Sequence, residues 1–272
     1  MIEVAAPTMG DRELAGFATL FERHTGIRYR PEKRGLLVSR LVGRLRARGL
    51  TDFASYLKLL DNPTERAELM RLIDVLTTHE TFFWREPSHF EFLEDWLDAL
   101  PGRPQKLRAW SAASSTGEEG YTLAMTLAGK LPLGSFEVVG TDVSPGVVQT
   151  ANQGLYPLGR AQHIPDAAKQ RWCRKGAGEY DGTFLIAREL RAHVKFSVAN
   201  LMVPQPTLGK FHVAFLRNVL IYFRPDQQRN VVRNVVDRLI PGGLLIVGHS
   251  ESATNAHPKL QVVVPSVYRL GE

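Results

Sequence analysis

Residues 107–117, LRAWSAASSTG, and residues 136–142, FEVVGTD, decide the fold class of this 272-residue chain. Each begins with a short apolar run typical of a buried strand, and a helix is predicted between them, from Glu118 to about Leu131. The first strand leads into a loop of small residues, and the second ends in an acid, Asp142. Small residues let a ligand approach the backbone, and an acid in this place can bond ribose hydroxyls. The pattern predicts a nucleotide-type ligand; the alternative is a plain strand-to-helix turn with a surface aspartate.

Strands and helices continue to alternate after Asp142, which predicts a parallel, doubly wound sheet. Helices are expected to begin at Ser144-Pro145 and to cover 225–240, and a final antiparallel edge is expected at 262–270. The further predicted strands lie at 194–198, 211–216 and 244–248.

The stretch from about 160 to 195 interrupts this alternation. It contains a short helix near 166–174 and the glycine-rich turn GAGEYDG at 176–182. Apolar runs follow at 183–186 and 190–196. A glycine-rich turn before such runs indicates a small antiparallel β insertion.

The first part of the chain is expected to be all-helical. Apolar residues recur at helical spacing, and Asp11, Pro31 and Pro63 suit helix starts. A fifth helix is predicted over 87–100. The domain boundary falls between the helical and the α/β patterns, and we divide the chain into residues 1–78 and 79–272.

The formal net charge is +6, and the basic residues are not spread evenly along the chain. Residues 23–48 contain nine Lys or Arg and one acid, Glu32. Arg40, Arg44 and Arg48 follow one another at i, i+4 spacing and therefore share a helix face. Such a basic patch attracts an acidic partner, which can be nucleic acid, an anionic membrane or an acidic protein surface; the alternative is an ordinary solvated helix face.

Other bulk features predict a cytoplasmic protein. The chain has one cysteine, so it forms no internal disulfide. Residues 1–10 lack a basic start followed by an apolar core, and no apolar run is long enough to span a bilayer. No membrane insertion is therefore expected, and nothing in the sequence requires an oligomer, so a monomer is predicted.

Five segments together resemble CheR methyltransferases, in order and spacing and over nearly the whole chain. They are TTHETFFWRE at 77–86, WSAASSTGEE at 110–119, GTD at 140–142, RNVLIYF at 217–223 and GHSE at 248–251. The resemblance implies an α/β fold class: a small all-helical N-terminal domain and a Rossmann-like S-adenosylmethionine-dependent methyltransferase domain with an inserted small antiparallel β subdomain. The loop after the first strand has one glycine and lacks the dinucleotide fingerprint, but S-adenosylmethionine has no pyrophosphate to cradle.

The resemblance also implies the reaction and its residues. The family transfers a methyl group from S-adenosylmethionine to glutamate side chains of chemotaxis receptors, which leaves S-adenosylhomocysteine. Asp142 would hold the ribose, Glu119 would face the cationic end of the methionine moiety, and Arg85 would meet its carboxylate or the incoming glutamate. Tyr222 would lie near the transferred methyl. The cofactor contacts carried over are His79, Thr81, Arg85, Glu119, Asp142, Asn200, Leu201, Arg217 and Asn218. Many relatives have Asn at the position of His79.

Little acid-base chemistry is needed for this reaction. A glutamate with an ordinary pKa of about 4.3 is already ionised near neutrality. Arg85 and Tyr222 are therefore predicted to position the substrate and to shape the electric field, without acting as a general base.

Two partner surfaces follow from the resemblance. Receptor methylation regions in this family are acidic helical bundles, along which the stripe of Arg40, Arg44 and Arg48 is expected to lie. One branch of the family binds a receptor C-terminal peptide as an added strand, and Gly176, Gly178 and Gly182 resemble that branch. The alternative is a hairpin that only supports the active site.

Two rival functions remain at this point: a nucleic-acid methyltransferase, and a non-catalytic module that binds a receptor or a nucleotide. No recognisable RNA-binding motif supports the first, so no nucleic-acid partner is expected. No metal site is predicted, because the histidines lack ligand spacing with Cys or Asp. Cys173 is expected to be inert and Glu251 an ordinary loop acid.

Overall fold

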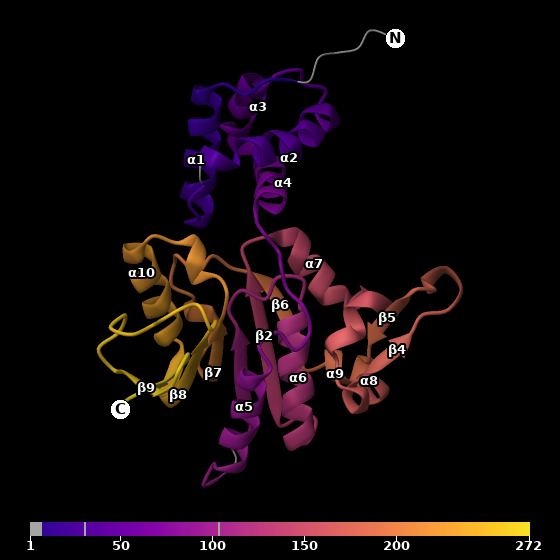
Figure 1. Cartoon of the computed structure of the whole chain (residues 1–272), viewed down its shortest axis with the longest axis vertical. Helices are drawn as coiled ribbons and strands as arrows, with labels where there is room; N and C mark the ends of the chain where they lie inside the picture. The colour runs from indigo at the N-terminus through magenta and orange to yellow at the C-terminus, as the bar shows by residue number, and fades with distance from the viewer. Residues whose placement is uncertain (1–6, 30, 103) are drawn as a thin grey trace. The chain divides into compact units, whose positions relative to one another are not determined.

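The computed structural model describes residues 7–29, 31–102 and 104–272. The chain divides into two compact units, labelled by element in Figure 1. A helical unit contains residues 1–78 and 222–224, and an α/β unit contains residues 79–221 and 225–272. Of the basic residues counted above, Arg30 lies outside the described residues, as do residues 1–6 of the N-terminal segment.

The helical unit contains α1 (Asp11–Thr25), α2 (Arg34–Ala47), α3 (Phe53–Leu60) and α4 (Arg66–Leu76). Local capping sets its boundaries. Asp52 accepts a hydrogen bond from the Ser55 backbone N–H at the start of α3, and Gly26 adopts a left-handed conformation that ends α1. One face of α2, at residues 37, 41 and 45, is buried against the other helices.

The α/β unit is built on a seven-stranded sheet of order β6-β2-β1-β7-β8-β10-β9. The first five strands in this order run parallel, and β10 and β9 are antiparallel additions. The strands are β1 (Leu107–Ser111), β2 (Phe136–Asp142), β6 (Val194–Val198), β7 (Phe211–Leu216), β8 (Leu239–Val247), β9 (Leu260–Val264) and β10 (Val267–Leu270). The predicted doubly wound parallel sheet is confirmed.

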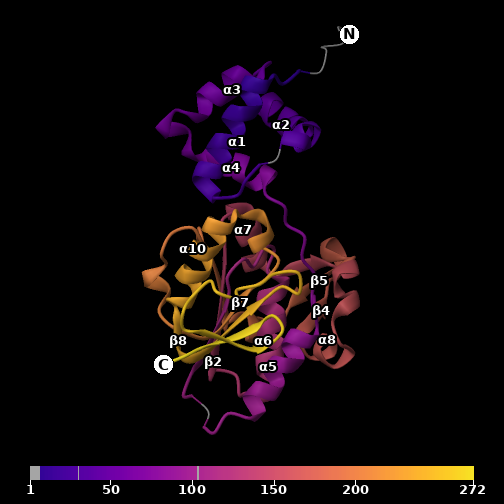
Figure 2. The ribbon, with the colours of Figure 1, turned by 60° about the vertical axis from the view of Figure 1, so that its left-hand side comes forward.

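The helices of this unit cover the sheet. They are α5 (Ser88–Asp98), α6 (Glu118–Lys130), α7 (Pro145–Gln153) and α10 (Pro225–Val236). α6 packs on β1 and β2, α7 on β2 and β6, and α10 on β8. α5 and α6 lie side by side, as Figures 1 and 2 show. The strand order changes direction between β1 and β7, and ligands of such folds bind at the carboxyl ends of the strands at this point.

A separate three-stranded antiparallel sheet forms the insertion, in the order β3-β5-β4. Its elements are β3 (Leu155–Pro157), α8 (Asp166–Trp172), β4 (Cys173–Lys175), β5 (Thr183–Ile186) and α9 (Arg188–Arg191). The insertion thus begins earlier than expected. The predicted strand at 190–196 is wrong in its first half, because the chain forms α9 there and only β6 pairs, with β2 of the large sheet.

Glycine is required in the loop between β4 and β5. A Cβ on Gly176 would lie 2.0 Å from the carbonyl oxygen of Tyr180, and Gly178 and Gly182 have φ angles of 61° and 78°.

The edge of the large sheet also differs from the prediction. A single antiparallel edge strand was expected over 262–270, but the chain forms a hairpin of β9 and β10 there, and Ser266 in its turn has a φ of 67°.

None of the helices in the described part of the chain combines the length and the apolar character needed to cross a bilayer.

Candidate functional site

Asp142 fixes the loop that follows β1. Its Oδ2 accepts the backbone N–H of Ser115 at 2.9 Å, and its Oδ1 accepts that of Ser144 at 3.0 Å. Burial raises the pKa of this carboxyl group and outweighs the two backbone donors. Gly117, with φ of 98°, approaches Ala151 so closely that a Cβ would lie 2.8 Å from the Ala151 Cβ. Asp142 therefore fixes the conformation of a tight loop of small residues. Its carboxylate has further lone pairs that can accept hydrogen bonds from a ligand.

The chain after β6 reaches the same edge of the sheet. The backbone N–H of Ala199 donates to the carbonyl oxygen of Asp142 at 2.8 Å, so Asn200 and Leu201 follow directly beside this strand end. Asn200 accepts the backbone N–H of Met202 at its side chain, and Asn234 binds the carbonyl of Leu201. These two predicted contact residues are thus ordered next to Asp142.

Arg217, at the end of β7, lies between two acids. Its Nη1 donates to Glu119 at 3.0 Å and its Nη2 donates to Glu86 at 3.0 Å. Arg217 is 4% exposed, and its guanidinium also lies over the rings of Phe90 and Phe215. We call Glu86, Arg217 and Glu119 the acid–arginine–acid cluster. It carries one more negative than positive group when both carboxyls are ionised.

The two acids of this cluster have opposite pKa shifts. Glu119 accepts the Ser111 hydroxyl at 2.6 Å, and burial raises its pKa in spite of Arg217. Burial also acts on Glu86, but hydrogen bonds from Asn218 and Arg217 and the positive charge of Arg217 outweigh it and lower its pKa to about 2. Glu86 is therefore a carboxylate at any physiological pH.

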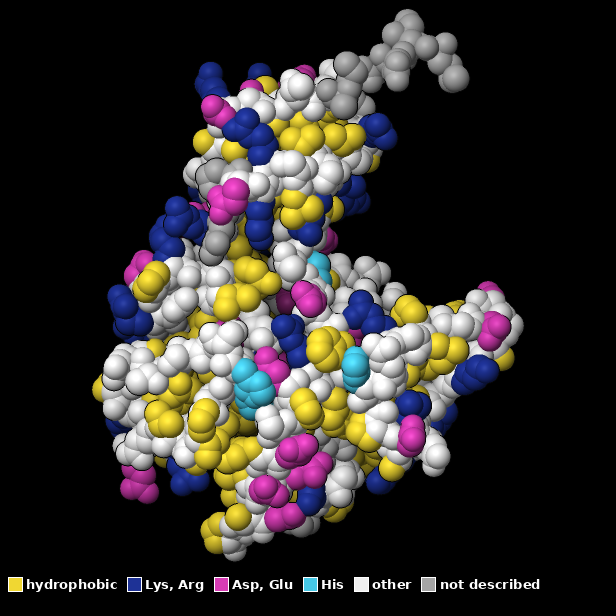
Figure 3. All heavy atoms as spheres, viewed as in Figure 1, with side chains coloured by type: hydrophobic (Ala, Val, Ile, Leu, Met, Phe, Trp, Pro, Cys, Tyr) yellow, Lys and Arg dark blue, Asp and Glu magenta, His cyan; other side chains and the backbone are white. Residues whose placement is uncertain are grey.

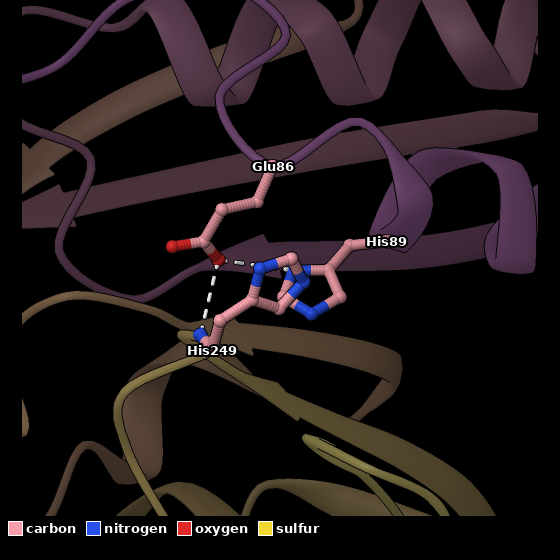
Figure 4. Close-up of side chains that lie close together, drawn as sticks. All are labelled: Glu86, His89 and His249. Carbon is pink, nitrogen blue, oxygen red and sulfur yellow. Dashed lines mark hydrogen bonds and ion pairs between the residues drawn. The ribbon is translucent and has the colours of Figure 1, made fainter.

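Glu86 was missed by the sequence analysis and links three segments. Its Oε1 accepts the Asn218 side-chain amide at 3.0 Å, and its Oε2 accepts the His249 backbone N–H at 3.3 Å, as drawn in Figure 4 for His249. Glu86 and Asn218 have φ angles of 55° and 54°, a left-handed backbone that is uncommon outside glycine and that clusters at functional sites. The only signal in the sequence was its place directly after Arg85.

The expectation for Glu251 is wrong. Its carboxylate accepts four backbone N–H groups, those of Gly248, Asn218, Leu220 and Ile221, at distances of 2.9, 2.7, 2.7 and 3.3 Å. It fixes the loop after β7 and is therefore a structural residue of the site. No local pattern reveals this role, because three of its four partners come from another loop.

The segment 79–86 reaches the loop after β1 through His79, whose carbonyl accepts the Ser115 hydroxyl at 3.4 Å. Thr81 presents its carbonyl to Arg160 at 2.6 Å. Arg85 donates to the Glu80 carbonyl at 2.8 Å, and its own carbonyl accepts from Arg217. The structure thus brings the cofactor residues carried over from the resemblance to one end of the sheet; their roles stay predictions.

Tyr222 belongs to the helical unit, where its carbonyl accepts the backbone N–H of Arg28 at 3.3 Å. Its predicted place near the transferred methyl therefore stays a prediction.

The three arginines of the predicted stripe have partners within the helical unit. Arg44 forms a two-pronged pair with Glu68 at 2.8 and 2.7 Å. Arg48 pairs with Glu65 at 2.8 Å, and Arg40 donates to the carbonyl oxygens of residues 76 and 77. This face of α2 is directed toward α4, which neither interpretation of the stripe anticipated. Among the described basic residues of 23–48, the exposed ones are Arg23, Arg28, Lys33, Arg34 and Arg46.

Comparisons with known proteins match both units. The family described as "CheR methyltransferase, all-alpha domain" matches residues 12–77, and "CheR methyltransferase, SAM binding domain" matches residues 79–268. The chemotaxis protein methyltransferase of Escherichia coli is 36% identical over 97% of this chain and 92% of its own length. Chemotaxis protein methyltransferase 2 of Pseudomonas aeruginosa is 39% identical over 90% and 88%. Among solved structures, the magnesium protoporphyrin IX methyltransferase of Synechocystis has a TM-score of 0.41 and 14% identity, over 69% of this chain and 80% of that one.

Proposed function

Because the chain belongs to the CheR methyltransferase family, we propose that it methylates glutamate side chains of chemotaxis receptors in the cytoplasm. The SAM-binding domain of the family covers residues 79–268, so S-adenosylmethionine is the methyl donor. The single observation that carries the proposal is the acid–arginine–acid cluster beside Asp142, at the strand ends where such folds bind their ligand.

The charges of this site suit S-adenosylmethionine. The methionine moiety carries an ammonium, a carboxylate and a sulfonium, and therefore has a net positive charge. The cluster offers the opposite excess when both of its carboxyls are ionised. Glu119 would face the cationic end, and Arg85 would meet the carboxylate. Asp142, already held by Ser115 and Ser144, would bond the ribose hydroxyls.

Methyl transfer needs alignment more than proton transfer. A carboxylate oxygen of the substrate attacks the methyl carbon, the carbon–sulfur bond breaks, and its electron pair remains on sulfur. The products are a glutamate methyl ester and neutral S-adenosylhomocysteine. Arg85 and Tyr222 would orient the incoming carboxylate without removing a proton. An Arg85→Ala protein is expected to lose turnover; unchanged turnover and cofactor affinity would contradict its role.

The acidic helical methylation region of a receptor is the proposed partner of the helical unit. Since Arg40, Arg44 and Arg48 are engaged internally, Lys33, Arg34 and Arg46 supply the exposed charge on α2, and Arg34 also pairs with Asp11. A receptor C-terminal peptide would bind at an edge of the small sheet, next to the loop of Gly176, Gly178 and Gly182.

The α/β unit does not offer a uniformly basic surface for nucleic acid. Acidic side chains gather over α5 in Figure 3, where Glu91, Glu94, Asp95 and Asp98 lie at least partly exposed. Phosphate binding requires clustered Lys and Arg.

The decisive experiment offers labelled S-adenosylmethionine to receptor-rich membranes and, in parallel, to total RNA. Label on receptor protein that leaves as methanol under mild alkali is expected, because carboxyl esters are base-labile. An Asp142→Asn protein should bind the cofactor more weakly and label less. Label on RNA would overturn the substrate, and cofactor binding without any transfer would identify a non-catalytic module.

A further inference from the structure

Two neighbouring potential ligand residues, Glu86 and His89, meet a third from a distant segment, His249, at the acid–arginine–acid cluster. Glu86, His89 and His249 each offer one ligand atom, and these atoms lie within 4.8 Å of one another. Figure 4 shows the two imidazole rings against the carboxylate, with His89 at the first turn of α5 and His249 in the loop after β8. We propose that these residues form a binding site for a divalent transition-metal ion of the zinc type.

His89 carries the first part of the argument. It is 3% exposed, and within the part of the chain that the structure describes neither ring nitrogen has a hydrogen-bond partner. Buried polar groups are nearly always satisfied, and an orphan costs about 1–3 kcal/mol. An ion bound at Nδ1 would supply a partner that this ring lacks.

The geometry fits the size of such an ion. His89 Nδ1 lies 3.4 Å from Glu86 Oε2. Two ligands on a tetrahedral zinc, with bonds of about 2.0–2.2 Å, lie roughly 3.3 Å apart. His249 is exposed, which leaves room for water as a further ligand.

His249 also has the partner that a ligating histidine usually has. Its Nε2 lies 3.2 Å from the Ser88 hydroxyl. When Nε2–H donates to this hydroxyl, the other nitrogen, Nδ1, keeps its lone pair and can bind the ion. Ser88 and His89 are neighbours at the start of α5, so a single turn supplies one ligand and orients another.

Glu86 has one acceptor position that none of its three donors uses. Of the roughly four lone-pair directions of a carboxylate, one on Oε1 is used by Asn218 and two on Oε2 are used by Arg217 and the His249 N–H, so the open direction lies on Oε1. An ion bound at Oε2 would replace the His249 N–H contact, which at 3.3 Å is the longest of the three. Arg217 is an opposing charge, since its Nη2 lies 3.0 Å from Oε2, but Glu119 on the far side of the guanidinium offsets it. The mixed nitrogen and oxygen ligands favour zinc, or cobalt in its place, over calcium or magnesium.

The test uses the full chain without a polyhistidine tag, stripped with a chelator and titrated with Zn²⁺ by calorimetry. Co²⁺ absorption in the visible range gives a second readout of tetrahedral binding. We expect one ion per chain in the unchanged protein and its loss in His249→Ala, which removes an exposed side chain and so keeps the fold. Ser88→Ala should weaken affinity about tenfold, and His163→Ala, another exposed histidine of the same unit, should change nothing.

Two results would overturn the proposal. One is the absence of Zn²⁺ binding at micromolar concentration by the unchanged protein. The other is binding that persists undiminished in His249→Ala, which would place the ion elsewhere. Neither readout involves methyl transfer, so the outcome is independent of the proposed function.

Discussion

The two units each contain a buried cluster of carboxylates and arginines, in opposite ratios. In the helical unit, Glu68 is 1% exposed and is approached by Arg44, Arg48 and Arg71, with Tyr56 as a further donor. In the α/β unit, one arginine, Arg217, lies between two acids. Positive charge is in excess around Glu68, and negative charge is in excess around Arg217.

This difference in charge indicates that the cluster around Glu68 is structural and that the cluster around Arg217 binds a ligand. Around Glu68 every carboxylate oxygen has donors from the same unit, and the backbone is regular helix. Around Arg217 the backbone is left-handed at Glu86 and Asn218, and Arg217 Nε is without a hydrogen bond among the described residues. Strain and incomplete pairing are typical of a site that a ligand completes.

Arg217→Ala should produce the largest effect. It leaves two carboxylates buried without their counterion, and breaking a buried pair this way costs about 3–5 kcal/mol. Urea unfolding followed by tryptophan fluorescence measures this loss in the free energy of unfolding, and cofactor affinity should fall with it. Arg217→Lys keeps the positive charge but loses the planar guanidinium that donates to both acids, so this variant is expected to lose less stability than Arg217→Ala. An Arg217→Ala protein as stable as the unchanged protein would show that the two acids do not depend on this arginine as their counterion.

Glu68→Gln should destabilise the helical unit by about 1.5–3 kcal/mol and leave cofactor affinity unchanged. Burial acts to raise the Glu68 pKa, but hydrogen bonds from Arg44 and Tyr56 outweigh it, so the pKa lies below its ordinary value of 4.5. The stabilisation is therefore complete above pH 4.5 and is lost as the pH falls through the lower folded value.

The difference in midpoint temperature between the unchanged protein and Glu68→Gln should accordingly shrink in acid. Glu65→Gln is the matched control, since its pair with Arg48 is partly exposed and worth at most about 1 kcal/mol. A difference in midpoint temperature that grows in acid would mean that the pKa of Glu68 is raised on folding, and would contradict this prediction.

Glu86→Gln, measured in chelator, should weaken S-adenosylmethionine binding about tenfold, or roughly 1.4 kcal/mol. The amide oxygen still accepts from one partner, but its NH₂ group meets a donor, either Asn218 or Arg217. Calorimetric affinity with circular dichroism as a fold control checks this. An affinity equal to that of the unchanged protein would leave Glu86 a purely structural residue.

Arg46→Ala should have the smallest effect. Loss of one exposed charge is expected to raise the KM for receptor about twofold without changing kcat, and the difference should vanish at high salt. Arg12→Ala, an exposed arginine on α1, is the control. Equal effects of both variants at every ionic strength would remove α2 as the receptor surface.

Local signals made the parallel sheet and the loop after β1 predictable. The apolar runs at 107–111 and 136–142 are short, and the acid at the end of the second is visible in sequence. The i, i+4 rule correctly placed the three arginines, of α2 and its C-cap, on one face. No rule within one helix shows that Glu68 of α4 and Glu65 at its N-cap lie opposite. Charge counted along a chain is therefore a weak measure of exposed charge.

The cluster around Glu86 depends on contacts that no local pattern encodes. Glu86 and Arg217 are 131 positions apart, and the four donors of Glu251 belong to two loops. Only the fold brings these residues to one end of the sheet. The sequence analysis predicted no metal site, and the proposed one depends on His249, which only the fold brings to Glu86 and His89.

The two backbone hydrogen bonds that fix Asp142 have a kinetic consequence. An adenosine ligand that enters beside β2 meets a carboxylate oriented when the chain folded, within a loop whose glycine already contacts α7. Under the proposed function, spent product is exchanged for fresh cofactor after every methyl transfer. Each exchange then requires only that the ligand diffuses to a loop that is already ordered. No segment around Asp142 has to become ordered again between turnovers.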